Sequence, residues 1–199
     1  MCIEASTINT GFSRESFSAG THMCLVFRDE TERRKMVSKF VESGVLDDER
    51  VSYFVDDGTP SDVIEWLASM DVDLTEAQKR HFLSVENAAD TYCPDGTFKP
   101  DRMLNSLKEL YTESKEAGYP NARVTGEMSW ALRGMPGSER LIEYESRINT
   151  VVKTHPITAM CQYDAHKFSG RLIYKALQVH PYIVVNGQLI KNPYYISEE

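Results

Sequence analysis

Glu127, Ser129 and Trp130 lie close together in the stretch ARVTGEMSWAL, at and just after the end of the expected strand 122–127. A second group, Tyr163 and Asp164, lies in the same way at the end of the expected strand 157–163. If both strands are parallel, these side chains meet at the carboxyl edge of a sheet, where ligands of α/β proteins bind. Two functions are possible for these side chains. The carboxylates can exchange protons with a substrate, or the aromatic rings can bind a small molecule between them.

Glu127 and Asp164 form the candidate acid–base pair, because paired carboxylates with different pKa values can exchange protons with a substrate. The structural alternative is that Asp164 caps the following helix. Glu127 would then bind a backbone amide or Arg28. Both interpretations stay open for Glu127, because its place at a strand end requires an explanation.

Cys161 is a candidate nucleophile, with His166 or His180 as its base. A reactive thiol needs an electropositive and accessible setting, and Cys161 lies within an apolar run. We therefore interpret Cys161 as a core residue.

A metal site could recruit the side chains of His22, Cys24, Cys161 and His180. No established ligand spacing connects them, and the two histidines open strands at the end opposite the expected pocket. Structural histidines are therefore favoured, and no metal or cofactor is expected.

The first expected strand–helix junction reads VFRDETERR, which contains no glycine and no Gly-Lys-Ser/Thr sequence. A phosphate-binding loop needs these residues to surround the anion with amides and to hold magnesium. Asp29 and Glu32 would instead satisfy the helix dipole themselves. This junction argues against ATP hydrolysis, and dinucleotide and nucleophile-elbow motifs are also absent.

The 199 residues carry a formal net charge of −8, with 41% hydrophobic and 26% charged residues. This composition is typical of a globular domain, and it argues against binding of nucleic acid or anionic membranes, which requires a basic face. We expect a cytoplasmic protein whose four cysteines are free thiols.

Apolar periodicity predicts alternating strands and helices after a flexible N-terminal tail at 1–20. The Asn186–Gly187 pair predicts a final hairpin. Strands are expected at 22–27, 50–55, 81–86, 122–127, 157–163, 181–185 and 188–190, with helices at 29–44, 59–70, 100–118, 138–152 and 164–180. The alternation predicts one α/β domain at 21–196, with a mostly parallel central sheet covered by helices on both faces.

Six phrases in order carry a family resemblance: HMCLVF, FVESGVLDDERVSYF, RVTGEMSWAL, YESRIN, MCQYDAHKF and VHPYIVVNGQLIKNPYY. Together they resemble the MEDS domain, the methanogen/methylotroph, DcmR-type sensory domain. The resemblance covers about residues 20–195. It implies a fold similar to the RecA/KaiC ATPase core with a degenerate phosphate loop, in which RVTGE occupies the place of the magnesium-binding strand. Gly44–Val45–Leu46 departs slightly from the family's usual Gly-Leu.

The resemblance implies a non-enzymatic sensory domain for small hydrocarbon derivatives, one-carbon or halogenated compounds among them, that signals to a histidine kinase or transcription regulator. The predicted ligand contacts are Arg28, Glu127, Ser129, Trp130, Tyr163 and Asp164. One alternative is a pseudo-ATPase interaction module without a small ligand, and another is a residual nucleotide-binding enzyme that uses Glu127. A homodimer is compatible with each of these.

Overall fold

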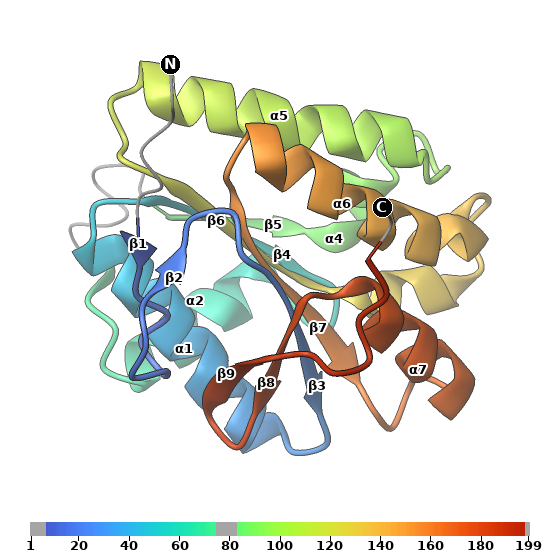
Figure 1. Cartoon of the computed structure of the whole chain (residues 1–199), viewed down its shortest axis with the longest axis horizontal. Helices are drawn as coiled ribbons and strands as arrows, with labels where there is room; N and C mark the ends of the chain where they lie inside the picture. The colour runs from blue at the N-terminus through green and yellow to red at the C-terminus, as the bar shows by residue number, and fades with distance from the viewer. Residues whose placement is uncertain (1–6, 75–82, 198–199) are drawn as a thin grey trace.

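The computed structural model describes residues 7–74 and 83–197 and contains one seven-stranded sheet between two layers of helices (Figure 1). The strand order is β5-β4-β6-β7-β3-β8-β9, and every pairing is parallel except β8 with β9. The sheet strands are β3 (His22–Phe27), β4 (Arg50–Val55), β5 (Leu83–Asn87), β6 (Ala122–Glu127), β7 (Thr158–Asp164), β8 (Tyr182–Val185) and β9 (Gln188–Lys191).

Helices cover both faces of this sheet, as the alternating pattern predicts. The helices of one face, α1 (Glu30–Leu46) and α2 (Pro60–Ser69), bury Phe40, Val63 and Leu67 against β3 and β4. The other face is covered by α5 (Pro100–Glu116), α6 (Leu141–Thr154) and α7 (Gly170–Val179). The short helices α4 (Ala88–Tyr92), η1 (Met128–Arg133) and η2 (Ser138–Arg140) complete that layer. The predicted α/β class is therefore confirmed, and part of the predicted strand 81–86 lies outside the described residues.

The β8–β9 turn confirms the hairpin predicted from Asn186 and Gly187. Both residues have positive φ, 48° and 70°, as a type I′ turn requires. Because β8 pairs in parallel with β3, the hairpin extends the main sheet.

Residues 7–20, expected to be a flexible tail, pack against the domain in the structure. β1 (Thr7–Ile8) and β2 (Phe17–Ser18) form a small antiparallel ladder, and Ile8 and Phe12 are buried. These two apolar side chains in a Ser- and Thr-rich stretch explain the difference, since each removes apolar surface from water.

The two ends of α7 are held in different ways. Ser169, and not Asp164, caps its first turn, with Oγ 3.3 Å from the Leu172 amide. At the other end, Asn192 Nδ2 donates to the carbonyls of Leu177 and His180 at 2.6 and 2.7 Å. The last carbonyls of the helix, which have no partner within it, are therefore tied to neighbouring segments.

Candidate functional site

A groove of about 860 Å³ lies at the carboxyl ends of β3 and β7, between the first turns of α1 and the length of α2. This is the edge of the sheet at which the sequence predicts a pocket, since parallel strands present their ligand sites there. The groove is lined by Phe27, Arg28, Glu30, Arg33, Arg34, Asp57, Gly58, Asp62, Val63, Glu65, Trp66, Ser69, Asp164 and His166.

Aromatic rings and arginines form the wall of the groove on the α1 and α2 side. The Arg33 guanidinium lies 5.5 Å from the centre of the Phe27 ring and 5.9 Å from that of Trp66. Arg34 lies 5.7 Å from the Trp66 ring. Such cation–π contacts hold the rings and the charges in fixed positions, so the groove offers flat apolar surfaces between polar groups.

The β3–α1 junction, where an ATPase would bind phosphate, is closed by the protein's own carboxylates. Asp29 Oδ1 accepts a hydrogen bond from the Glu32 amide at 2.9 Å and caps α1, as predicted. Glu30 binds Arg33 through two contacts, one of them Nε–Oε2 at 2.7 Å. The positive end of the helix dipole is thus already neutralised by acidic side chains.

Glu127, at the end of β6, lies behind Arg33 and is almost completely buried. Its Oε1 accepts from the Tyr53 hydroxyl at 2.5 Å and from Arg33 at 2.9 Å. Its Oε2 accepts from the backbone amides of Asp56 and Asp57 at 2.9 and 2.7 Å. Burial and the charge of Glu127 raise the pKa of Tyr53 above its ordinary value. We refer to Glu127, Arg33 and Tyr53 as the arginine centre.

The structure separates the predicted ligand contacts into two groups. Arg28 and Asp164 line the groove, as the prediction requires, and the Arg28 carbonyl contacts His166 Nε2 at 3.1 Å. Glu127, Ser129, Trp130 and Tyr163 do not line it. Ser129 Oγ donates to Asp56 at 2.8 Å, beside the arginine centre.

Trp130 and Tyr163 are fully buried in the core, where the prediction placed them in the pocket wall. The Trp130 ring stacks on Tyr92 with centroids 4.6 Å apart. Tyr163 donates to Glu145 at 2.8 Å. Both side chains belong to the core of the α5–α6–α7 face. Tyr163 is within β7 and shares the face of Cys161, two residues before it, because side chains alternate along a strand. Trp130 follows β6 in η1 and packs on the same face.

Sequence reasoning missed Arg33 and Trp66 as groove residues. Arg33 lies in the expected helix 29–44, in a highly charged stretch, and Trp66 lies in the expected helix 59–70. The available signal was the charge of Arg33 on the first turn after β3, because that turn faces the carboxyl edge of the sheet.

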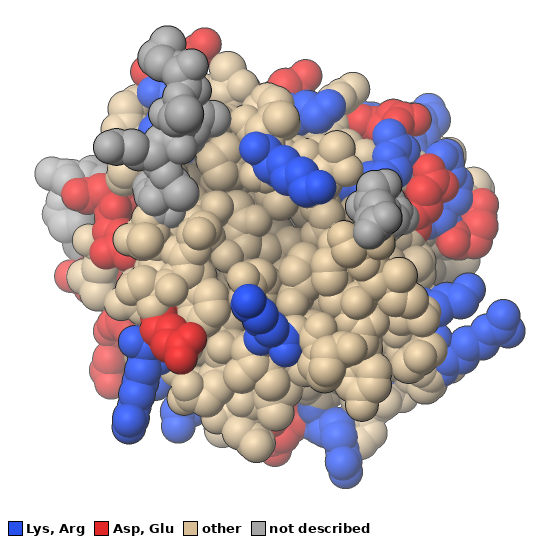
Figure 2. All heavy atoms as spheres, in the orientation of Figure 1, with Lys and Arg blue, Asp and Glu red and all other residues tan. Residues whose placement is uncertain are grey.

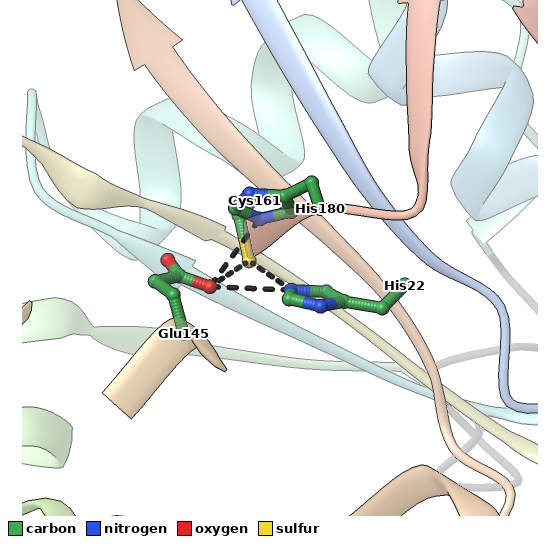
Figure 3. A group of neighbouring side chains, drawn as sticks. All are labelled: His22, Glu145, Cys161 and His180. Atoms are coloured by element: carbon green, nitrogen blue, oxygen red, sulfur yellow. Dashed lines mark hydrogen bonds and ion pairs between the residues drawn. The ribbon is translucent and has the colours of Figure 1, made fainter. Parts of the chain in front are cut away.

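Four buried side chains form a second cluster on the α6–α7 side of the sheet: His22, Glu145, Cys161 and His180, which we call the histidine centre (Figure 3). Their donor atoms all lie within 4.8 Å of one another. Glu145 Oε2 lies 3.2 Å from His22 Nε2, 3.2 Å from Cys161 Sγ and 3.3 Å from His180 Nε2. Figure 3 shows the four side chains converging from separate segments. His22, Cys161 and His180 belong to the set considered from the sequence for a metal site, and Glu145 was not part of that set.

Burial shifts the protonation equilibria of the histidine centre. Burial and the neighbouring His180 lower the pKa of His22, which favours the neutral imidazole. Burial and the charge of Glu145 raise the pKa of Cys161 well above its ordinary value. The predicted core position of Cys161 is therefore confirmed, and its thiol has little nucleophilic character.

The comparison with family models matches residues 21–181 to the description "MEthanogen/methylotroph, DcmR Sensory domain". The chain belongs to the MEDS family. A curated relative, the transcriptional repressor DcmR of Methylorubrum extorquens, is 35% identical over 79 residues. That match spans 39% of this chain and 30% of the repressor.

Solved structures support the predicted similarity to the KaiC fold. A KaiC-like protein from Pyrococcus horikoshii OT3 matches with a TM-score of 0.64 and 17% identity, over 90% of this chain and 79% of that one. Flagellar accessory protein FlaH from Methanocaldococcus jannaschii matches with a TM-score of 0.65 and 10% identity, over 94% and 84% of the two chains. At these identities the likeness concerns the fold alone. The described part of this MEDS chain contains no helix that could cross a membrane.

Proposed function

We propose that this MEDS domain is a non-enzymatic sensor that binds a small organic molecule in the groove between α1 and α2. The single observation that carries the proposal is the groove itself, an open hollow with ring surfaces at the carboxyl edge of a parallel sheet. The family match supports a sensory role without naming the ligand.

The charges around the groove favour a small, uncharged ligand. Arg28, Arg33 and Arg34 are outnumbered by five carboxylates along the lining, which are Glu30, Asp57, Asp62, Glu65 and Asp164. A nucleotide triphosphate would meet these carboxylates and no loop of backbone amides. A small one-carbon or halogenated compound would instead contact the flat faces of Phe27 and Trp66.

The arginine centre also favours binding over turnover. Both oxygens of Glu127 are occupied by four donors, which leaves the carboxylate poorly placed to hold a magnesium ion or activate water. Glu127 therefore acts as a positioning residue that fixes Arg33 and the loop at Asp56 and Asp57. This arrangement keeps the back of the groove rigid.

The segment 164–169 connects the groove with α7 and would pass a movement in the groove to that helix. Asp164 and His166 line the groove, and Lys167 pairs with Asp57 across its mouth at 2.8 Å. The same segment leads directly into α7. A ligand that displaces Asp57 or His166 would shift the first turn of α7, provided that it binds the two arrangements with different affinity.

Tryptophan fluorescence tests this function, because the two tryptophans of the chain occupy different environments. Trp66 lines the groove and Trp130 lies in the core. We expect saturable quenching when methylated and halogenated one-carbon compounds are titrated into the chain. The Trp66→Phe variant, which retains Trp130, should give no quenching.

Quenching that persists in Trp66→Phe would show that the ligand binds elsewhere and would contradict the groove as its binding site. An absence of both quenching and thermal stabilisation across the compound panel would reject the sensor function. Arg34→Gln serves as a second variant, since it removes one cation from the Trp66 face while Trp66 remains. We expect a weaker apparent affinity with an unchanged fold in circular dichroism.

An exposed apolar surface favours a second candidate function, a protein-interaction module without a small ligand. Figure 2 views the molecule from the side of β8, β9 and α7, where uncharged side chains dominate the central area. The exposed large apolar residues of this region are Tyr174, Val185, Ile190, Tyr194 and Ile196. Apolar patches of this kind commonly mark protein interfaces, and a kinase, a transcription regulator or a second copy would fit there.

Sedimentation measurements distinguish this second function from the first. Concentration-dependent association that disappears in Ile190→Asp, in a chain that binds no compound of the panel, would favour the interaction module. Compound binding with no association would favour the sensor alone.

A further inference from the structure

The histidine centre contains a buried carboxylate that lacks a permanent positive partner. The Glu145 side chain is fully buried, and its ion-pair contacts among the described residues are with His22 and His180. An isolated carboxylate in a protein interior is costly unless a cation or several donors compensate it. Whether the imidazoles of His22 and His180 can compensate the charge of Glu145 depends on which of their nitrogens carry protons.

Neighbouring carbonyl groups determine the protonation of both imidazoles. Asn149 Nδ2 donates to the Val179 carbonyl at 2.8 Å, so its Oδ1 must face His22 Nδ1, 3.0 Å away. That oxygen can only accept, and His22 Nδ1 therefore carries a proton. His180 Nδ1 is fixed in the same way, 2.7 Å from the Ala176 carbonyl. In neutral rings both Nε2 atoms then present lone pairs to Glu145.

Lone pairs directed at a carboxylate repel it unless a cation lies between them. His180 Nε2 makes no hydrogen bond, although it lies 3.3 Å from Glu145 Oε2. An imidazole whose Nδ1–H is held by a carbonyl and whose Nε2 is free is the arrangement found in metal-binding histidines. The outer contacts of a metal site are therefore in place around His22 and His180.

Four of the six distances between donor atoms are close to those around a tetrahedral ion, and all six are within 4.8 Å. Ordinary zinc bond lengths at tetrahedral angles place nitrogen and oxygen ligands about 3.4 Å apart and sulfur about 3.6 Å from either. The structure has 3.2 and 3.3 Å from the carboxylate to the two imidazoles. Cys161 Sγ lies 3.2 Å from Glu145 Oε2 and 3.5 Å from His22 Nε2.

We propose that His22, Glu145, Cys161 and His180 bind one divalent transition-metal ion of the zinc class. Two nitrogens, one oxygen and one sulfur suit a borderline-soft ion, and four protein ligands leave no open position, as in structural sites. Binding forms the metal–sulfur bond and releases the thiol proton of Cys161 to solvent. One divalent cation, one carboxylate and one thiolate then sum to zero charge, which suits a fully buried site.

This ion would join segments that are distant in sequence. His22 opens β3, Glu145 lies in α6, Cys161 lies in β7, and His180 follows α7 (Figure 3). Asn149 and Val179, which lie beside the centre, also line a hollow of about 170 Å³ at the surface.

Cobalt titration tests the site with a spectroscopic signal that a packing role would not produce. The 199-residue chain is unfolded with a chelator and refolded with Co²⁺, because a buried site loads during folding. We expect one cobalt per chain, visible bands of a tetrahedral ion and an ultraviolet thiolate-to-cobalt band. Zn²⁺ should displace the cobalt and raise the melting temperature above that of the chelated protein.

Variants separate the proposed ligands from other cysteines. Cys161→Ser should abolish the thiolate band, and His180→Gln should lower cobalt affinity at least tenfold. Cys93→Ser removes a buried thiol outside the centre and should retain the full spectrum. Cobalt binding that survives both ligand variants would overturn the proposal. Refolded wild-type protein with no tetrahedral bands and no zinc-dependent rise in melting temperature would also overturn it, whether or not the variants fold.

Discussion

The arginine centre and the histidine centre each surround one buried carboxylate, but they neutralise it differently. Glu127 is paired with Arg33, which stays positive at any physiological pH. Glu145 meets two imidazoles and a thiol, none of which is positive in its ordinary neutral form. The arginine centre is thus neutralised within the chain, whereas the proposed metal site would neutralise Glu145 with an ion from solution.

Removing the Glu127 carboxylate from the arginine centre should lower the unfolding free energy more than the other changes compared below. Glu127→Ala leaves the buried Arg33 with Glu30 as its remaining carboxylate. Removing one member of a buried ion pair costs about 3–5 kcal/mol of unfolding free energy. Urea denaturation measures this loss. In Glu30→Ala, where the removed carboxylate is half exposed, we expect about 1 kcal/mol or less. Equal losses in the two variants would show that Glu127 is not the main partner of Arg33.

The two tyrosines that donate to these carboxylates provide a matched pair. The Tyr53 hydroxyl donates to Glu127 and accepts from Arg33, whereas the Tyr163 hydroxyl donates to Glu145. A hydrogen bond to a charged group contributes about 1.5–3 kcal/mol. We expect the loss of unfolding free energy to be near the upper end of that range for Tyr53→Phe and near the lower end for Tyr163→Phe. Urea denaturation of both variants in chelator tests this order, and the reverse order would contradict it.

Glu145→Gln in chelated protein should have a smaller effect, within about 1 kcal/mol of wild type, because an amide can donate to a histidine lone pair. Zinc should stabilise the wild type and leave the variant unchanged. If the histidines were instead protonated and paired with Glu145, the chelated variant would lose about 3–5 kcal/mol. Thermal and urea unfolding with and without zinc therefore separate a metal centre from an ion pair.

The exposed pair at the mouth of the groove should show the smallest effect. The Lys167 ammonium lowers the pKa of Asp57, by hydrogen bonding and by charge. A carboxylate with a lowered folded-state pKa contributes stability above its unfolded pKa of about 3.9, and that stability is lost as pH falls through the folded value. We expect Asp57→Asn to cost at most about 0.5 kcal/mol at pH 7. Urea curves of variant and wild type should converge below pH 3, and a difference that persists there would refute the assignment.

Local sequence patterns were sufficient for most of the fold. The strands 22–27, 50–55 and 122–127 agree exactly with the structure, because each is a short apolar run bounded by polar or turn residues. Asp29 was identified as a cap and Asn186–Gly187 as a hairpin turn, since both depend on adjacent residues alone. The start of α7 differed, because Ser169 competes with Asp164 for the cap.

The two centres depend on contacts that no local pattern carries. Cys161 of the histidine centre lies on β7, which pairs with β3 opposite Cys24. The two strands are more than a hundred residues apart in the chain. Glu145 lies in the expected helix 138–152, at helical spacing with its apolar residues. Its charge among apolar neighbours was the available signal of a buried polar centre. Tertiary packing also determines on which side of the sheet Trp130 lies. Trp130 is buried in the core, whereas the sequence predicted it in the wall of the pocket.

The unequal attachment of α7 has a mechanical consequence. Its last carbonyls are bonded to Asn149 and Asn192, while its first turn follows the segment that lines the groove. Ten residues at about 1.5 Å each give an arm of about 15 Å. If the first turn, which Ser169 caps, is displaced while the bonds at the last carbonyls hold, the helix pivots about its last turn and the displacement is greatest beside the groove. The exposed ring of Tyr174, partway along the arm, would sweep a fraction of that arc, converting a small local push into a graded tilt of the outer surface.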